Sequence, residues 1–172
     1  TQFASSAASD VYKRQFTGSV KAGYDVQRAT HEKFIDMALE LGGKDPAYAR
    51  YDCDLEKTVD NLVDGSFFNS GQSCCGIERI YVDEKIFNSF LELFISKTYN
   101  YKLGNPLEQE NNLGPVVKLS AAEFIINQMN KAIDKGAKKM IDENKFHFPK
   151  EHKNYLVPQV LTNVNHEMDF MT

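Results

Sequence analysis

Cys74 and Glu40 have the side-chain types and surroundings that nucleophilic catalysis requires. Cys74 lies in the run Ser-Gly-Gln-Ser-Cys-Cys-Gly. A cysteine is an effective nucleophile when its thiolate is accessible and stabilised. Small neighbours also let backbone N–H groups approach the oxygen of a carbonyl under attack. On this pattern alone, an inert buried thiol is an equally good interpretation of Cys74, and the better one for Cys53 and Cys75.

Glu40 lies inside an apolar run, Ile35 to Leu41, just before Gly42-Gly43. A carboxyl group at the end of a buried strand is poorly solvated. Burial favours its protonated form, and such a group suits general-base catalysis near neutral pH. The alternative is a solvated or salt-bridged glutamate at a strand end, and the local pattern by itself favours that alternative.

Two glycines, Gly18 and Gly23, form a G-x-x-x-x-G pattern at a predicted strand-to-helix turn. Backbone donors and a helix N-terminus at such a turn can bind a pyrophosphate. The pattern is not the three-glycine dinucleotide fingerprint and is weak by itself. No metal site is expected, because the four histidines lack ligand spacing and the chain has no C-x-x-C.

The elements that must position these residues alternate between strands and helices. A β-prone stretch ending at Phe16–Ser19, a helix over Val20–His31 and a buried strand over Phe34–Leu41 predict a βαβ unit. Asp54 is the expected N-cap of a helix that begins at Leu55.

Further helices are expected over Glu84–Tyr99 and from Leu119 to Gly136. Short strands are expected over Arg79–Val82, Lys138–Ile141 and Val157–Leu161. Apolar stripes at helical spacing are interpreted as core, namely Leu55, Val59, Leu62 and Val63; Phe87, Phe90, Leu91 and Phe94; and Leu119, Ala122, Ile126, Met129 and Ile133. The fold class predicted is α/β.

Composition excludes several classes of function. Of the 172 residues, 42% are hydrophobic and 26% charged, with a net charge of −4, which indicates a globular protein without a nucleic-acid or membrane partner. No apolar run approaches the ~20 residues that span a bilayer. The N-terminus lacks the apolar core of a signal peptide, and three cysteines make no disulfide framework. We therefore expect free thiols and a cytoplasmic location.

The first fifteen residues, Thr1 to Gln15, differ from the rest of the chain. They are rich in Ser and Ala, and their ASDVYKRQ end resembles a translated adapter sequence. We interpret residues 1–15 as a non-native or disordered N-terminal segment and leave them out of the predicted fold. A flexible native terminus is the alternative.

The candidate residues occur together in five motifs that resemble those of one family, the NAD(P)-dependent aldehyde dehydrogenases. The run from Leu39 to Pro46 resembles the family's glutamate signature, and Phe67 to Gly76 resembles its cysteine signature, with Arg79 five residues after Cys74. The other motifs are Phe16-Thr17-Gly18-Ser19 with Gly23, which resembles the coenzyme loop, and two landmarks, Leu103-Gly104-Asn105-Pro106 and Leu113-Gly114-Pro115.

The resemblance implies a mechanism and roles for the residues. Cys74 would attack an aldehyde, lose a hydride to NAD or NADP, and form a thioester that a water activated by Glu40 hydrolyses to a carboxylic acid. Glu40 also argues against the branch that uses coenzyme A. Cofactor contacts are implied for six residues: Thr17, Gly18, Ser19, Gly23, Leu41 and Gly42.

The implied fold is a partial aldehyde-dehydrogenase-like fold. Residues 16–41 would be the end of a Rossmann-like coenzyme-binding domain, and residues 42–172 a catalytic domain on a mixed sheet that is truncated at its C-terminal end. The family's upstream coenzyme half, its oxyanion-hole asparagine, its Glu-x-Phe-Gly-Pro motif and its oligomerisation strand are missing. The chain alone is expected to be inactive and to aggregate through open sheet edges, while the parent protein would be a homodimer or homotetramer.

Two other classes of function remain open. A non-catalytic relative with the same fold would be favoured by loss of Cys74 or Glu40, and both are present. A different cysteine-dependent enzyme, such as a thiol hydrolase, usually needs a histidine base near the thiol. None of the four histidines lies next to Cys74 in the sequence.

Overall fold

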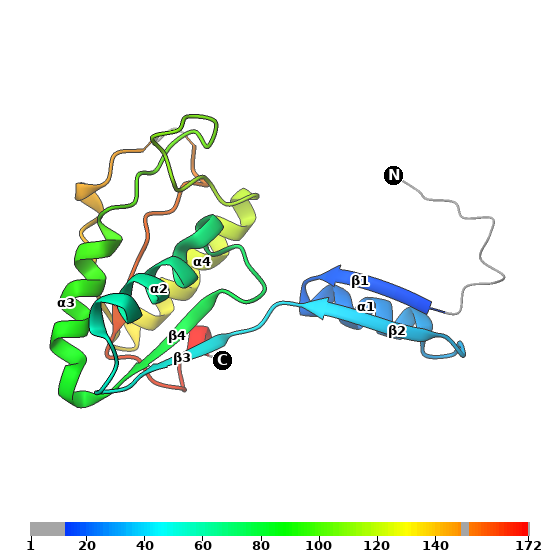
Figure 1. Cartoon of the computed structure of the whole chain (residues 1–172). Coiled ribbons are helices and arrows are strands. Elements are labelled where there is room, and N and C mark those ends of the chain that lie inside the picture. Colours follow the sequence, from blue (N-terminus) through cyan, green and yellow to red (C-terminus); the bar gives the residue numbers. More distant parts are fainter. Residues whose placement is uncertain (1–12, 149–151, 172) are drawn as a thin grey trace. The chain divides into compact units, whose positions relative to one another are not determined.

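The computed structural model describes residues 13–148 and 152–171, which belong to two compact units (Figure 1). The first unit ends at Gly43 and the second begins at Lys44. Each unit packs around its own elements and is described by itself. The assignment of residues 16–41 and 42–172 to a coenzyme-binding and a catalytic domain stays a prediction.

The first unit is a strand–helix–strand motif. β1 (Lys13–Gly18) and β2 (Asp36–Leu41) are parallel, and α1 (Val20–Thr30) connects them and packs against both (Figure 1). Ser19 caps α1, because its hydroxyl accepts the N–H of Ala22 at 3.3 Å. The predicted βαβ unit is therefore confirmed.

Two expectations for this unit are corrected. β2 is only half-buried, and the side chain of Phe34, expected in a buried strand, is fully exposed. The reason is that β2 pairs only with β1 among the described residues and α1 covers one face. The residues Lys13 to Gln15, left out of the predicted fold, form the first half of β1. Residues 1–12 lie outside the described residues.

The second unit begins with another strand–helix–strand motif. β3 (Asp45–Ala49) and β4 (Ile77–Val82) are parallel, and α2 (Leu55–Phe67) lies between them in sequence. Asp54 caps α2 as predicted, accepting the N–H of Lys57 at 3.1 Å. Sequence analysis missed β3, because it is short and contains a proline and two alanines, which are rare in strands.

The main core joins α2 to α3 (Phe87–Thr98), which follows a short 3-10 turn, η3 (Glu84–Ile86). Phe90 and Phe94 stack with their ring centroids 5.7 Å apart. The predicted helix over Glu84–Tyr99 is thus confirmed with a tighter first turn, although Phe87 is exposed rather than core. The buried members of this cluster are Ala49, Val59, Val63, Phe90 and Phe94.

The predicted helix before Gly136 is α4 (Leu119–Asp134), and Gly136 follows it with φ +101°. Its apolar stripe is core only in part, because Leu119 and Ile126 are exposed. α4 packs at its C-terminal end against η5 (Asp169–Met171). The buried cluster there consists of Ala132, Ala137, Met168 and Met171.

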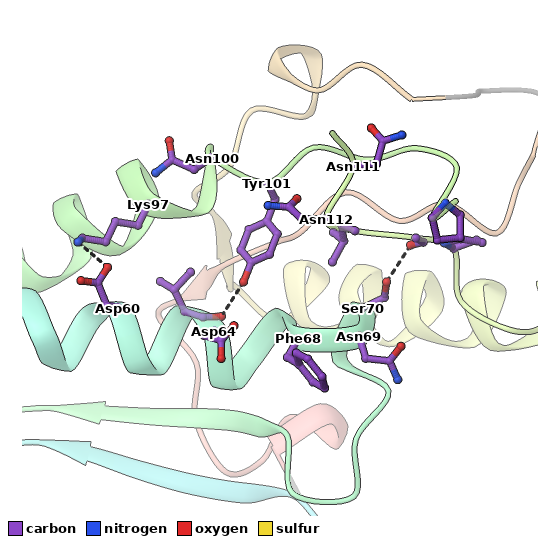
Figure 2. A pocket seen from close by; sticks show the side chains of 15 residues that line it. Asp60, Asp64, Phe68, Asn69, Ser70, Lys97, Asn100, Tyr101, Asn111 and Asn112 are labelled. Atoms are coloured by element: carbon purple, nitrogen blue, oxygen red, sulfur yellow. Dashed lines mark hydrogen bonds and ion pairs between the residues drawn. The ribbon is translucent and has the colours of Figure 1, made fainter. Parts of the chain in front are cut away.

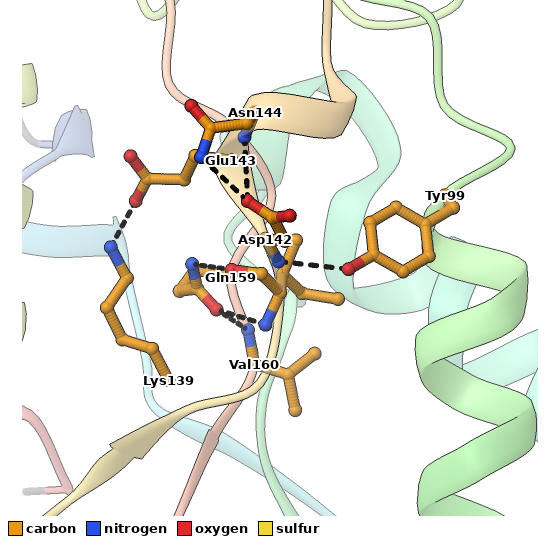
Figure 3. A network of polar contacts seen from close by, with 8 residues as sticks. Tyr99, Lys139, Asp142, Glu143, Asn144, Gln159 and Val160 are labelled. Atoms are coloured by element: carbon orange, nitrogen blue, oxygen red, sulfur yellow. Dashed lines mark hydrogen bonds and ion pairs between the residues drawn. The ribbon is translucent and has the colours of Figure 1, made fainter.

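The two predicted strands near the C-terminus are short. β5 (Lys138–Lys139) is antiparallel to β6 (Leu161–Thr162). Beyond them a side chain replaces the strand partner: Gln159 accepts the N–H of Ile141 at 3.0 Å and donates to its carbonyl at 3.2 Å (Figure 3). The turn η4 (Glu143–Lys145) follows, and Tyr99 accepts the N–H of Asp142. The described chain has the predicted α/β class, with parallel and antiparallel strand pairs.

The Asp54 cap generates a stability prediction. Asp54→Ala leaves first-turn N–H groups of α2 without a side-chain acceptor, and we expect a loss of about 1 kcal/mol in the free energy of unfolding. Urea denaturation followed by circular dichroism measures it. Asp52→Ala is the matched control, because it removes an exposed ion pair with Arg50 instead of a helix cap. Equal losses in the two variants would contradict the capping role.

Candidate active site

Six of the predicted cofactor and base residues gather where β1 and β2 end. The parallel register places Thr17 opposite Glu40 and Gly18 opposite Leu41. Gly23 is buried in the first half of α1, and a Cβ atom there would lie 3.0 Å from both terminal carbons of Leu41. A side chain at this position would press α1 away from β2. The list is Thr17, Gly18, Ser19, Gly23, Glu40 and Leu41, and Gly42 follows Leu41 directly.

The N-terminus of α1 lies at the same end of the strands. The first turn of α1 carries no acidic residue, so no carboxylate of that turn neutralises the positive end of the helix dipole. Backbone N–H groups of a first helical turn lack partners within the helix and suit a phosphate. This arrangement fits the phosphate groups of a dinucleotide.

Glu40 is exposed in the first unit, which corrects the expectation of a desolvated carboxyl group. Successive side chains of a strand point to opposite faces. Leu39 and Leu41 are half-buried, and Glu40 lies on the face that α1 leaves open. The base candidate belongs to the first unit and the nucleophile candidate to the second.

Cys74 lies in a tight turn of the second unit. The N–H of Gly76 donates to the carbonyl of Ser73 at 3.2 Å, with Cys74 and Cys75 at the two central positions. Both cysteines are exposed, and Cys53 is half-buried. Gly76 is buried, and a Cβ there would lie 3.3 Å from the carbonyl oxygen of Ser73. The hydroxyl of Ser73 contacts the sulfur of Cys75 at 3.4 Å. That contact does not involve the sulfur of Cys74.

The chain reaches this turn through an unusual backbone. After α2 a short 3-10 turn, η2 (Phe68–Gly71), contains three consecutive residues in the left-handed region: Asn69 at φ 52°, Ser70 at 59° and Gly71 at 72°. Two of them are not glycine and therefore carry a conformational cost. Sequence reasoning did not find this feature, although Asn and Gly favour such backbone.

Arg79 ties the strand after the cysteine turn to two other segments. Its guanidinium donates to the carbonyl of Lys44 at 2.9 and 2.6 Å, and to the carbonyl of Met171 at 3.3 Å. Lys44 in turn forms an ion pair with Glu78. Arg79 thereby fixes the start of β3 and the C-terminal turn against β4.

An open cleft of about 840 Å³ lies beside the residues that precede Cys74 (Figure 2). Tyr101 lines this cleft. Burial, followed by the negative charge of Asp64, raises the pKa of its phenol. A hydrogen bond to Asp60 is the main cause that raises the pKa of Lys97. Asn69 and Ser70 line the cleft, but Cys74 does not. The cleft therefore borders the approach to the cysteine turn.

Two kinds of feature are not found in the part of the chain that the structure describes. Residues 13–148 and 152–171 contain no group of three or more His, Cys, Asp or Glu side chains arranged to hold a metal ion. Within the same residues, no helix has the length and apolar character that crossing a membrane requires.

Comparison with known proteins identifies relatives over nearly the whole chain. Residues 4–172 match the aldehyde dehydrogenase family. The lactaldehyde dehydrogenase of Methanocaldococcus jannaschii is 40% identical over 126 residues, covering 73% of this chain and 27% of the relative.

Two solved structures are similar in fold. One is a glyceraldehyde-3-phosphate dehydrogenase of Methanocaldococcus jannaschii complexed with NADP, at 33% identity and TM-score 0.84, covering 94% of this chain and 34% of that one. The other is a betaine aldehyde dehydrogenase of Staphylococcus aureus in complex with NAD+, at 28% identity and TM-score 0.85, covering 94% and 32%. The chain thus spans about a third or less of the length of these relatives.

The raised pKa of Tyr101 generates a prediction for alkaline pH. The unfolded chain ionises this phenol near its ordinary value of about 10, whereas the folded chain holds the proton to higher pH. The contribution of Tyr101 to the free energy of unfolding is therefore fully present below pH ~10 and is lost as the pH rises through the pKa of Tyr101 in the folded chain. In Tyr101→Phe, the free energy of unfolding measured by urea denaturation should decline less between pH 9 and 11 than in the unchanged chain. The exposed Tyr48 provides the control, Tyr48→Phe, and an identical decline in both variants would refute the assignment.

Proposed function

Because the chain belongs to the aldehyde dehydrogenase family, we propose that the protein oxidises an aldehyde to a carboxylic acid with NAD or NADP. The observation that carries the proposal is an exposed cysteine at the centre of a tight turn, Cys74, in a chain that matches this family over residues 4–172. The two complexes among the similar structures support both cofactors.

The cofactor is proposed to bind at the carboxyl ends of β1 and β2. When bound, its oxidised nicotinamide supplies the acceptor for the hydride. Thr17, Gly18 and Ser19 would hold the nicotinamide and the phosphates, and the first turn of α1, which has no acidic residue of its own, would receive the phosphates. Leu41 would offer its carbonyl to the carboxamide, while Gly23 allows α1 to pack closely on Leu41.

Cys74 is the proposed nucleophile. Its thiolate adds to the carbonyl carbon of the aldehyde, and the carbonyl electrons move to oxygen to give a thiohemiacetal. The backbone N–H of Cys74 stabilises this oxyanion. Loss of a hydride from the same carbon restores the carbonyl group and leaves a thioester on Cys74.

Glu40 is the proposed general base of the second half-reaction. It accepts a proton from water, and the resulting hydroxide adds to the thioester carbon. Collapse of that adduct breaks the carbon–sulfur bond, releases the carboxylic acid and regenerates the Cys74 thiolate. The exposed position of Glu40 in the first unit is compatible with access to water.

We predict that the 172-residue chain alone does not reduce NAD+ or NADP+. The reason is that the residues proposed to hold the nicotinamide come from one strand–helix–strand unit, whereas the relatives are about three times longer. Absorbance at 340 nm with a panel of aldehydes measures the reaction. Aldehyde-dependent hydride transfer by the purified chain would contradict this prediction.

The nucleophile is tested without the cofactor by an activated ester. p-Nitrophenyl acetate should acetylate Cys74 and give the same kind of thioester, located by mass spectrometry of the intact chain and its peptides. We expect Cys74→Ser to abolish this acetylation, and Cys75→Ser to retain it. Acetylation that persists in Cys74→Ser and disappears in Cys75→Ser would assign the nucleophile to the neighbouring residue.

A further inference from the structure

We infer that Ser70 and Gln72 are positioning residues that hold the Cys74 turn by clamping it to the segment at residues 113–117. The inference rests on the proposed function of Cys74. It gives a role to Leu113-Gly114-Pro115, which sequence analysis identified as a motif without a chemical task. All of the contacts lie within the second unit.

Ser70 makes the first contact of the clamp. Its hydroxyl donates to the carbonyl of Gly114 at 2.7 Å, across 44 positions of sequence. Figure 2 shows Ser70 directed from the end of α2 toward this neighbouring segment. The contact is made from a residue at φ 59°, a backbone conformation that is costly for serine. The hydrogen bond offsets that cost only while the 113–117 segment stays in place.

Gln72 makes the second contact with both ends of its amide. Its oxygen accepts the N–H of Val117 at 2.8 Å, which fixes the orientation of the amide group. Its nitrogen then donates to the carbonyl of Asn69 at 3.1 Å and, more weakly, to that of Pro115 at 3.5 Å. One side chain thus joins the left-handed turn to the 113–117 segment.

Asn69 closes the loop from the other side. Its amide nitrogen donates to the carbonyl of Gln72 at 3.0 Å, and the N–H of Gln72 donates back to the carbonyl of Asn69 at 3.1 Å. The residue after Gln72 begins the Ser73–Gly76 turn that presents Cys74. Asn69 thus holds the backbone of Gln72 at both its N–H and its carbonyl, and the side chain of Gln72 is held by the 113–117 segment, which leaves the cysteine turn little freedom to rotate.

The far side of the clamp is itself well supported. Leu113 is buried in a cluster with Leu103, Ile141 and Phe146. The side-chain amide of Asn154 donates to the carbonyl of Val116 at 2.9 Å. The N–H of Val116 donates to the carbonyl of Asn154, also at 2.9 Å. The 113–117 segment is therefore a fixed support, and Ser70 and Gln72 transmit its position to the cysteine turn.

Two variants separate positioning from plain stability. Ser70→Gly removes the bond to Gly114 but relieves the left-handed cost at φ 59°, so the two effects on unfolding offset each other. Gln72→Met keeps the length of the side chain and removes both polar ends. Ser66→Ala is the matched control, because it removes a hydroxyl-to-carbonyl bond of the same 2.7 Å length that lies within α2.

The experiment measures hydrogen exchange and cysteine alkylation in the full 172-residue chain. In Gln72→Met the amide of Val117 should exchange about tenfold faster, as expected for loss of its bond. In both clamp variants, alkylation of Cys74 by iodoacetamide at pH 7 should fall about fivefold relative to Cys53, on the scale of one lost hydrogen bond. The reason is that a turn released from the 113–117 segment presents Cys74 in one orientation for less of the time. Gln72→Glu keeps an oxygen acceptor for the N–H of Val117 and should restore both the slow exchange and the alkylation rate.

Three outcomes would overturn the inference. One is an unchanged exchange rate of the Val117 amide in Gln72→Met, which would show that the Gln72–Val117 hydrogen bond does not hold the two segments together. Another is an unchanged rate of Cys74 alkylation in both variants despite faster exchange at Val117 in Gln72→Met, which would leave a structural contact without a positioning role. The third is an equal effect in Ser66→Ala. Ester acetylation that fails in the wild-type chain would instead count against Cys74 as nucleophile, and the exchange data would still decide the clamp.

Discussion

Parallel pairing of consecutive strands is the constraint on which the rest of this structure depends. Two strands that follow each other in sequence can be parallel only if the chain returns through a connection, and here α1 and α2 make those connections. In the first unit this geometry brings Thr17 opposite Glu40 and sets the N-terminus of α1 at the same end. The candidate residues therefore come together although they are more than twenty positions apart in sequence.

The second unit uses the same motif in a different way. Its candidate nucleophile does not follow a strand but lies between the end of α2 and the start of β4. A connection from a helix into a parallel strand must reverse the chain direction within a few residues. The left-handed backbone at Asn69, Ser70 and Gly71 achieves this reversal at a conformational cost. The hydrogen bonds of Ser70 and Gln72 offset the cost, so strain and tethering are two parts of one arrangement.

Much of the fold and some of the candidate site could be predicted from sequence, wherever the pattern that indicates a feature lies in neighbouring residues. The cap at Asp54, the helix over Val20–Thr30 and the parallel pairing of the first unit follow from cap residues and hydrophobic period. Family motifs singled out Cys74 and Glu40. β3 was missed because Pro46 and the two alanines have low strand propensity, and strand pairing with β4 overrides that preference.

The failures share a physical cause, which is dependence on distant contacts. Burial of Leu119 and Ile126 was inferred from helical spacing and that of Phe34 from an apolar run. Neither pattern states whether another element covers the apolar face. Similarly, the roles of Ser70 and Gln72 depend on partners more than forty positions away. No pattern of neighbouring residues contains that information, although small polar residues beside a reactive cysteine are a reason to examine the surrounding loop.

Three buried clusters in the described part of the second unit each support one side of the cysteine turn. The cluster around Val63 and Phe94 fixes the end of α2, from which the turn departs. The cluster around Leu113 fixes the segment that Ser70 and Gln72 contact, and the one around Met171 fixes a carbonyl that Arg79 binds just after the turn. An exposed cysteine makes few contacts of its own, so its position is determined by these surroundings. The position of Cys74 consequently depends on the packing of the whole second unit. Polar side chains connect the three buried clusters to the turn that contains Cys74.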